Sequence, residues 1–173
     1  SNGGHLYTFA VANVTHLRNY ASNVKSVAFD AMLITEHSMK PQHQHEAKER
    51  LGPGFVCHMS DLDPEKNVGV GGTACVLRGP KSMKVIQPRP ALSETLPYLS
   101  EGRLGLYALH IAAHEYVLAY VVYGWQGADH KPEAADRTDA LLTQVLADIA
   151  AQPIGPIMIA GDLNATISKS LPS

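Results

Sequence analysis

The stretch Ile157-Met158-Ile159-Ala160-Gly161-Asp162-Leu163-Asn164-Ala165 is the most informative part of this 173-residue sequence. It is typical of a hydrophobic strand that runs directly into Gly-Asp-x-Asn, which places a carboxylate and a carboxamide at the rim of a sheet. Gly161 permits a sharp turn or a close backbone approach. Asp162 and Asn164 are expected to alternate to the same side of an extended backbone and to face one ligand. A strand followed by an Asx turn without function is the competing interpretation.

The composition indicates one globular domain, residues 1–173, because 45% of the residues are hydrophobic and 17% are charged. A net charge of −2 excludes a strongly basic protein that gathers nucleic acid non-specifically, so any polyanion must bind at a local site. Cys57 and Cys75 lack the spacing of a zinc site or of a secreted disulfide framework. Without a secretory signal or an apolar run of about 20 residues, we expect an intracellular protein, with the nucleus among the options, and no membrane partner. The sequence identifies no protein partner.

The order of predicted elements is typical of an α/β protein. Apolar residues three and four apart predict a helix over 17–28, and Pro132 suits the first turn of a second helix that ends near 150. The predicted strands are His5–Val14, Ala31–Thr35, Phe55–Met59, Val68–Leu77, Leu104–Ala112, Tyr116–Tyr123 and Ile154–Ala160. The first two strands and the helix between them suggest a βαβ-like unit, and Leu104–Ala112 with Tyr116–Tyr123 suggests a hairpin.

Three other segments are expected to be irregular. His37–Pro53 is predicted to be a surface excursion with one helical turn near His45–Leu51. Val85–Pro97, which contains three prolines, is predicted to be a loop or a broken edge strand. The glycines of Gly69-Val70-Gly71-Gly72 do not match a phosphate-binding loop, and a bulged strand or a tight backbone contact fits them better.

Polar side chains stand at the ends of several predicted strands, and their order carries a resemblance to a known family. They are Asn13, Glu36, Tyr123, Asp162 and Asn164, in the short motifs Ala12-Asn13-Val14, Asp30-Ala31-Met32-Leu33-Ile34-Thr35-Glu36-His37, Gly71-Gly72-Thr73-Ala74, Val122-Tyr123-Gly124 and Gly161-Asp162-Leu163-Asn164. This ordered set resembles the endonuclease/exonuclease/phosphatase superfamily, and within it most closely the endonuclease domain of LINE-type (non-LTR) retrotransposons.

The resemblance implies a two-sheet α/β sandwich with outer helices and a metal-dependent phosphodiesterase that acts on DNA. It assigns Glu36 as the principal ligand of Mg²⁺ or Mn²⁺, with Asn13 beside it in the metal site. Tyr123 would contact the scissile phosphate, Asp162 would orient or deprotonate the attacking water, and Asn164 would stabilise the charge on phosphorus. Hard oxygen ligands suit these two cations better than zinc.

Departures from the family pattern suggest a fold that is incomplete at its C-terminus. Family members continue for roughly another third of a domain and supply a further Asp and a catalytic His, usually within Ser-Asp-His. Nothing after Asn164 can supply them here, so we expect the chain to be a truncated and inactive piece. His37 stands where the family often has Thr, and it would sit beside the metal ligand rather than across the phosphate.

Simpler interpretations stay open for each candidate. Glu36 could end a strand at the surface, Asn13 could form a turn, and Tyr123 could be a core aromatic with its hydroxyl at the rim. His43 and His45 favour a solvated loop over a metal site, and His110 and His114 favour a hairpin without a catalytic task. Five basic residues could form a local phosphate-binding edge or could equally be scattered surface cations: Arg78, Lys81, Lys84, Arg89 and Arg103.

Two other functions compete with a retroelement endonuclease. A phosphatase or lipid phosphodiesterase of the same superfamily suits the near-neutral charge. A catalytically dead remnant that binds polyphosphate or nucleic acid is the third possibility. 

Overall fold

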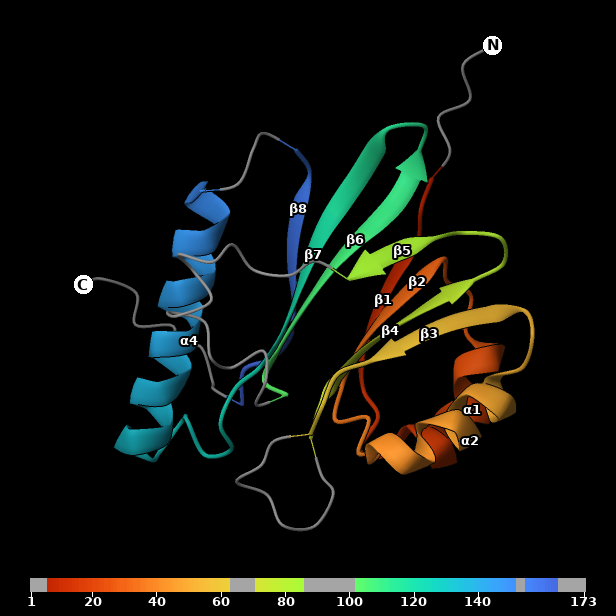
Figure 1. The fold of residues 1–173 in the computed structure, drawn as a ribbon. Helices are drawn as coiled ribbons and strands as arrows, with labels where there is room; N and C mark the ends of the chain where they lie inside the picture. Colours follow the sequence, from red (N-terminus) through yellow and green to blue (C-terminus); the bar gives the residue numbers. More distant parts are fainter. Residues whose placement is uncertain (1–5, 63–70, 86–101, 152–154, 165–173) are drawn as a thin grey trace.

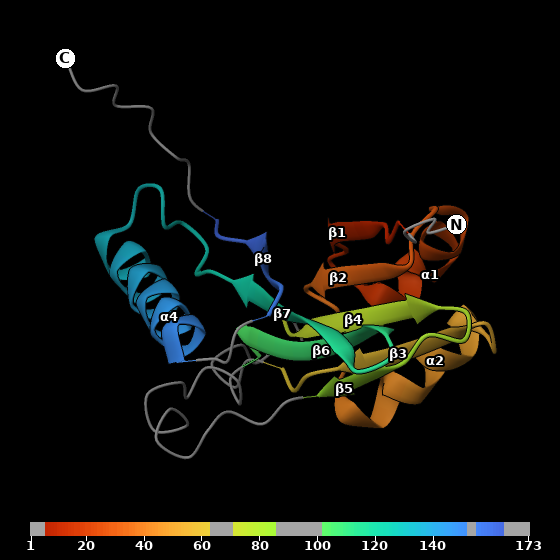
Figure 2. The same ribbon diagram turned by 90° about the horizontal axis from the view of Figure 1, so that it is seen from above.

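Two four-stranded sheets pack face to face and carry helices on their outer faces (Figures 1 and 2). The computed structural model describes residues 6–62, 71–85, 102–151 and 155–164. This architecture confirms the predicted two-sheet α/β sandwich with outer helices. No helix in these described ranges combines the length and the apolar character needed to cross a membrane.

The first sheet has the strand order β1-β2-β4-β3, in which β1 is Phe9–Asn13, β2 is Ala31–Thr35, β3 is Phe55–Met59 and β4 is Thr73–Arg78. Strands β1 and β2 are parallel because α1 (Leu17–Ser26) crosses between them, as the sequence predicts. Strand β4 lies antiparallel to both of its neighbours. A short turn η1 (Pro41–His43) and helix α2 (Gln44–Leu51) connect β2 to β3.

The second sheet has the order β5-β6-β7-β8, in which β5 is Met83–Val85, β6 is Leu104–Ala112, β7 is Glu115–Tyr123 and β8 is Ile157–Asp162. The β6–β7 pair is the predicted hairpin. Helix α4 (Pro132–Ala151) starts at the predicted proline and returns the chain, so that β8 runs parallel to β7.

Apolar side chains fill three layers, which explains the near-continuous hydrophobic runs of the central strands. Between the sheets, Leu33 and Leu77 meet Tyr107 and Val121. The opposite face of the first sheet packs on α1 and α2, and that of the second sheet packs on α4. Strands such as β2 are therefore buried on both faces.

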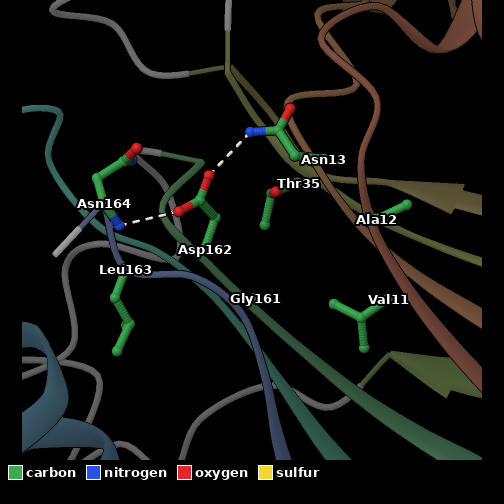
Figure 3. A pocket seen from close by; sticks show the side chains of 8 residues that line it. All are labelled: Val11, Ala12, Asn13, Thr35, Gly161, Asp162, Leu163 and Asn164. Atoms are coloured by element: carbon green, nitrogen blue, oxygen red, sulfur yellow. Dashed lines mark hydrogen bonds between the residues drawn. The ribbon is translucent and has the colours of Figure 1, made fainter. Parts of the chain in front are cut away.

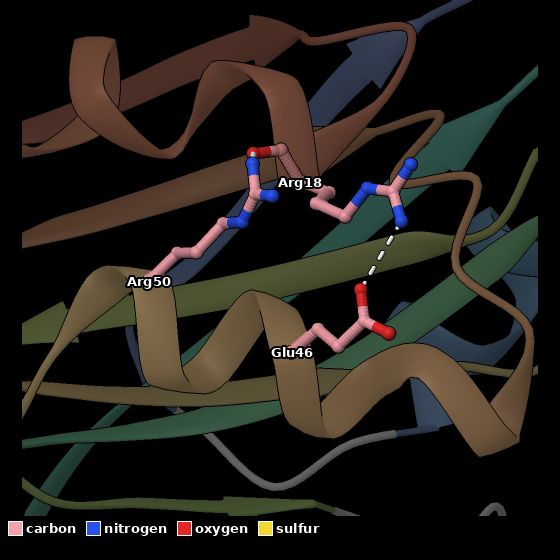
Figure 4. A network of polar contacts seen from close by, with 3 residues as sticks. All are labelled: Arg18, Glu46 and Arg50. Atoms are coloured by element: carbon pink, nitrogen blue, oxygen red, sulfur yellow. Dashed lines mark hydrogen bonds and ion pairs between the residues drawn. The ribbon is translucent and has the colours of Figure 1, made fainter.

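Helices α1 and α2 are also joined by polar contacts on their outer surface (Figure 4). Arg18 forms an ion pair of 3.1 Å with Glu46, and Arg50 donates a hydrogen bond of 3.2 Å to the carbonyl of Arg18. All three side chains are partly or fully exposed, so these polar contacts stabilise the fold less than the buried apolar contacts of the same helices do.

Several local predictions need correction. The segment 37–53 is not a surface excursion at its start, because His37, Ser38 and Met39 are buried, and it contains η1 as well as α2. Within the described residues the fourth strand begins at Thr73, because Gly71 and Gly72 both have positive φ and so depart from extended strand geometry. Gly72 does make the predicted tight contact, with His37. Gly69, Val70 and most of Val85–Pro97 lie outside the described residues.

Candidate active site

The carboxyl ends of β1, β2, β7 and β8 meet at one edge of the sandwich, and the candidate residues lie there. Strand register pairs Asn13 with Thr35 and Tyr123 with Asp162. A cavity of about 410 Å³ opens between the two sheets at this edge (Figure 3). Its lining consists of Val11, Ala12, Asn13, Thr35, Gly161, Asp162, Leu163 and Asn164. Glu36 and Tyr123 lie beside this cavity rather than in its wall.

Asn13 and Asp162 form the first bridge between the sheets. The amide Nδ2 of Asn13 donates a hydrogen bond of 3.0 Å to Oδ2 of Asp162 (Figure 3). The amide oxygen of Asn13 accepts a bond of 3.1 Å from the backbone N–H of Thr15. A reversed amide would place two oxygens against each other, so this network fixes the orientation of the amide. Asn13 therefore contacts Asp162 across the two sheets, and its predicted place beside Glu36 in a metal site stays a prediction.

Glu36 and Tyr123 form the second bridge. The hydroxyl of Tyr123 donates a hydrogen bond to Oε1 of Glu36. Burial, followed by the hydrogen bond and the charge of Glu36, raises the pKa of Tyr123 well above its ordinary value. Tyr123 is therefore a neutral hydrogen-bond donor at physiological pH and cannot act as a base. Its side chain is buried and its hydroxyl reaches Glu36, so the simpler core interpretation describes its packing correctly.

An unusual turn sends Glu36 toward the second sheet. Glu36 and Ser38 both adopt left-handed backbone conformations, with φ of 59° and 54°. Their backbone N–H groups donate to the carbonyls of Gly72 and Gly71, at 2.8 and 2.9 Å. The hydroxyl of Ser38 donates to the carbonyl of Thr15 at 2.6 Å, which ties this turn to the end of β1.

His37 lies under this turn, fully buried. Its Nδ1 accepts a bond of 2.9 Å from the N–H of Met39, and its Nε2 lies 2.8 Å from the carbonyl of Ser60. Burial lowers the pKa of His37 to about 4, so its ring is neutral at pH 7. The ring faces the protein interior, consistent with the prediction that it does not replace a catalytic histidine.

The predicted geometry of the Gly-Asp-x-Asn motif is wrong after Asp162. Strand β8 ends there, and Asn164 has a φ of 51°, so the two side chains do not alternate along an extended backbone. Instead the N–H of Asn164 donates to Oδ1 of Asp162 at 2.9 Å, which is an Asx turn. The Asn164 side chain donates to the carbonyl of Gly124 at 3.0 Å and still lines the cavity.

Gly161 is required by a close approach of two backbones. Its φ is 141°, and a Cβ atom at this position would lie 1.9 Å from the carbonyl oxygen of Val122 on β7. No side chain fits there. The glycine that the sequence singles out therefore brings β8 close enough to β7 to set Asp162 opposite Tyr123.

Arg103 supports the site in a way that the sequence does not indicate. It is buried, donates a bond of 2.8 Å to the carbonyl of Gly124, and places its guanidinium 4.6 Å from the ring centres of Tyr123 and Trp125. At the opposite end of the first sheet, Arg78 donates hydrogen bonds to backbone carbonyls and Lys81 forms an ion pair with Asp30. Lys84 is exposed, and Arg89 lies outside the described residues. The described cations therefore do not form the phosphate-binding edge that stood as one alternative.

The oxygen atoms at this edge fit a hard divalent cation. Glu36 uses only Oε1 toward Tyr123, which leaves Oε2 for another ligand, and Asp162 supplies a second carboxylate. Within the described ranges no group of three or more His, Cys, Asp or Glu side chains is arranged to hold a metal. A cation here would thus keep several water ligands, which is the usual state of Mg²⁺ in proteins.

The four other histidines that the sequence singles out lie on α2, on η1 and in the β6–β7 hairpin. His45 is exposed and pairs with Glu49 on α2, while His43 ends η1. His110 and His114 belong to the β6–β7 hairpin, as predicted.

Comparison with solved structures identifies the fold. No protein-family model and no curated protein sequence matches the chain. The chain is similar to the APE2 catalytic domain of Xenopus laevis, with a TM-score of 0.65 and 15% identity over 92% of this chain and 59% of that one. It is also similar to a 3'-5' exonuclease from Neisseria meningitidis, with a TM-score of 0.60 and 19% identity over 91% of this chain and 57% of that one.

A third similar structure is ANGEL2, a 2',3'-cyclic phosphatase, with a TM-score of 0.61 and 14% identity over 94% of this chain and 54% of that one. The chain thus spans a little over half the length of these structures. Identities this low establish the fold alone. The chain shares the two-sheet fold of nucleases and phosphatases of the endonuclease/exonuclease/phosphatase superfamily.

Proposed function

We propose that this chain carries part of the active site of a metal-dependent phosphodiesterase. The observation that carries the proposal is the placement of two carboxylates, Glu36 and Asp162, on opposite sheets beside one cavity. Both meet neutral donors: Tyr123 contacts Glu36, and Asn13 and the backbone of Asn164 contact Asp162. Within the described residues neither carboxylate has a cationic partner, so their charge is available to a metal ion.

The residues have distinct roles in this proposal. Glu36, through Oε2, and water would hold Mg²⁺ or Mn²⁺, which neutralises charge on a phosphate when bound. Asp162 is held by hydrogen bonds at both oxygens and has lone pairs left to orient a water molecule and take its proton. The Tyr123 hydroxyl and the Asn164 amide are neutral donors near the cavity and can stabilise phosphate oxygens after small rearrangements.

DNA is the proposed substrate, and an endonuclease domain of a retroelement-like protein is the proposed source of the chain. The short motifs around Asn13, Glu36 and Asp162 support this finer assignment. Because no histidine lines the cavity within the described residues, we expect these residues by themselves to give little turnover. Loss of one member of a catalytic unit can cost nearly as much as loss of all.

A phosphatase is the second candidate, and the charge distribution favours it. The net charge is −2, and the described arginines Arg78 and Arg103 are committed to internal contacts. A long polyanion gains less from such a surface than a small phosphate ester does. Supercoiled plasmid, a 3'-phosphorylated oligonucleotide and a 2',3'-cyclic nucleotide, each incubated with the protein and Mg²⁺, distinguish the two candidates.

Calorimetric titration with Mn²⁺ tests the metal site. Glu36→Gln removes the charge while keeping the shape, so Mn²⁺ affinity is expected to fall about tenfold or more. Glu49→Gln, an exposed position on α2, makes the same change in net charge and should leave the affinity unchanged. Equal affinities in the wild type and in Glu36→Gln would remove Glu36 from the metal role. Robust nicking of plasmid that Asp162→Ala abolishes would refute the expected low turnover.

A further inference from the structure

We infer that His37 is a positioning residue for Glu36: its ring holds the left-handed turn that directs the Glu36 carboxylate toward Tyr123 in the opposite sheet. The inference rests on the proposed function, because it assigns to His37 a role at the same metal site. It gives a task to a residue that departs from the family pattern and that takes no part in the proposed chemistry.

Both nitrogens of the His37 ring are used. Because Nδ1 accepts the N–H of Met39 at 2.9 Å, the hydrogen resides on Nε2 and is donated to the carbonyl of Ser60 at 2.8 Å. Ser60 directly follows β3. The ring therefore connects the turn after β2 to the end of β3, on the other side of β4.

The ring also packs on the backbone that binds Glu36. A Cβ atom at Gly72 would lie 2.2 Å from Nε2 of His37, so the ring rests directly on this glycine. The carbonyl of Gly72 accepts the N–H of Glu36 at 2.8 Å. The His37 ring, Gly72 and the Glu36 backbone thus form one closely packed unit, and a displaced ring would disturb the bond that orients Glu36.

The turn needs such support. Glu36 and Ser38 flank His37 and both adopt left-handed conformations that residues with a Cβ rarely populate. This conformation persists only where the surroundings hold it. It aims the Glu36 side chain across the sandwich, where Oε1 accepts the hydroxyl of Tyr123. Loss of the ring contacts would let the backbone at Glu36 relax and separate the carboxylate from Tyr123.

A double-mutant cycle separates positioning from a merely structural role. The shorter side chain of His37→Asn can still accept the hydrogen bond from Met39 but cannot extend to the carbonyl of Ser60. The longer side chain of His37→Gln can still donate a hydrogen bond to that carbonyl. Mn²⁺ affinity and the urea midpoint are measured for each variant, alone and together with Glu36→Gln. His45→Asn, at an exposed position on α2, is the matched control.

We expect His37→Asn to lower Mn²⁺ affinity about tenfold in the wild-type background and less than twofold beside Glu36→Gln, with partial recovery in His37→Gln. The loss of stability should be the same in both backgrounds. Equal losses of affinity in both backgrounds, or none in a folded His37→Asn variant, would overturn the inference. Failure of both His37 variants to fold would also overturn it, in favour of a purely structural histidine.

A metal-free measurement tests the positioning of Glu36 separately from the proposed metal binding. The carboxyl carbon resonance of Glu36 is followed by NMR in the wild type, in Tyr123→Phe and in His37→Asn. We expect His37→Asn to move this resonance toward its position in Tyr123→Phe, because both lose the same hydrogen bond. Absence of Mn²⁺ binding in the wild type, together with this shift, would refute the metal site and leave the positioning role standing. An unchanged resonance would overturn the positioning role alone.

Discussion

The two ends of the first sheet differ in the residues that adopt positive φ where the chain changes direction. At the site end, Thr15, Glu36 and Ser38 adopt left-handed conformations although each carries a side chain. At the opposite end, the left-handed positions are Gly52 and Gly79. A residue with a Cβ costs about 1 kcal/mol or more in this conformation and glycine does not. Of the two ends of the first sheet, the one beside the candidate residues therefore carries the backbone strain of side-chain-bearing residues with positive φ.

The same two ends differ in how they use charge. At the far end Asp30 pairs with Lys81 at 2.7 Å, and Arg78 donates to the carbonyls of Lys25 and Val27 at the end of α1. At the site end Glu36 and Asp162 meet only neutral donors within the described residues. Charge at the far end therefore pairs with charge or with backbone carbonyls, whereas the two carboxylates at the site end accept bonds from neutral groups, as the proposed metal site requires.

The largest expected effect comes from breaking the site end at Gly161. In Gly161→Ala the new Cβ would meet the carbonyl of Val122 at 1.9 Å, so β8 must separate from β7. We expect a loss of about 3 kcal/mol or more in the free energy of unfolding, measured with urea. Gly155→Ala has nothing within 4 Å and should change stability by less than about 0.5 kcal/mol. Similar losses in the two variants would contradict the close approach.

Acid should weaken the site end through His37. Burial lowers the pKa of His37 to about 4, the hydrogen bond to the Ser60 carbonyl and the charge of Asp61 oppose this by smaller amounts, and the charge of His16 adds slightly to the lowering. The unfolded chain, with an ordinary pKa near 6.5, binds the proton more tightly. Neutral His37 therefore makes its full contribution to the free energy of unfolding above about pH 6.5. This contribution is lost as the pH falls through about 4, and the total loss is at most about 3 kcal/mol.

Urea unfolding at pH 7 and pH 4.5 measures this loss in the wild type and in His37→Gln. The glutamine does not titrate, so the difference between the two proteins isolates the histidine from the carboxylates. Parallel pH dependences in the two proteins would show that the ring is protonated as easily when folded as when unfolded.

A break at the far end should lower stability without changing Mn²⁺ binding at the proposed metal site. Arg78 donates bonds of 3.0 and 2.7 Å to the carbonyls of Lys25 and Val27 and stacks 4.8 Å from the ring centres of Phe29 and Phe55. We expect Arg78→Ala to lose about 2 kcal/mol in urea unfolding and to keep its Mn²⁺ affinity. Arg50→Ala, with one exposed bond to Arg18, should lose less than about 1 kcal/mol. Weaker Mn²⁺ binding in Arg78→Ala would show that the two ends are coupled.

The smallest expected effects test the difference in backbone strain between the two ends of the first sheet. Thr15 is β-branched and exposed with a φ of 58°, so Thr15→Gly should gain up to about 1 kcal/mol in the free energy of unfolding. Gly79→Ala, at a φ of 75° with open space around it, should lose about the same amount. Changes of the same sign, measured by urea unfolding, would mean that the two ends do not differ in strain.

The spacing of apolar residues along the sequence was sufficient to predict the helices and strands that are held in place by an apolar face. The short connection between the two apolar runs in 104–123 predicts the hairpin, and the spacing of apolar residues after Pro132 predicts α4. The start of the 37–53 segment was predicted wrongly, because buried polar residues such as His37 have no periodic signal. Their burial depends on partners distant in sequence, here the carbonyl of Ser60.

The sequence by itself determined the order of the elements and the set of polar residues at strand ends, because hydrophobic periodicity and short turn motifs are local properties. The two-sheet fold was predicted from the family resemblance that those residues carry. Only the tertiary structure decided which of these residues touch. It joined Asn13 to Asp162 and Glu36 to Tyr123, turned Asn164 back onto Gly124, and buried Arg103 behind Tyr123. The physical reason is that the three hydrogen bonds join residues from 40 to 149 positions apart in sequence and that Arg103 reaches Tyr123 from the start of the neighbouring strand, so strand pairing, sheet packing and strained backbone turns, rather than local preference, set the directions of these side chains.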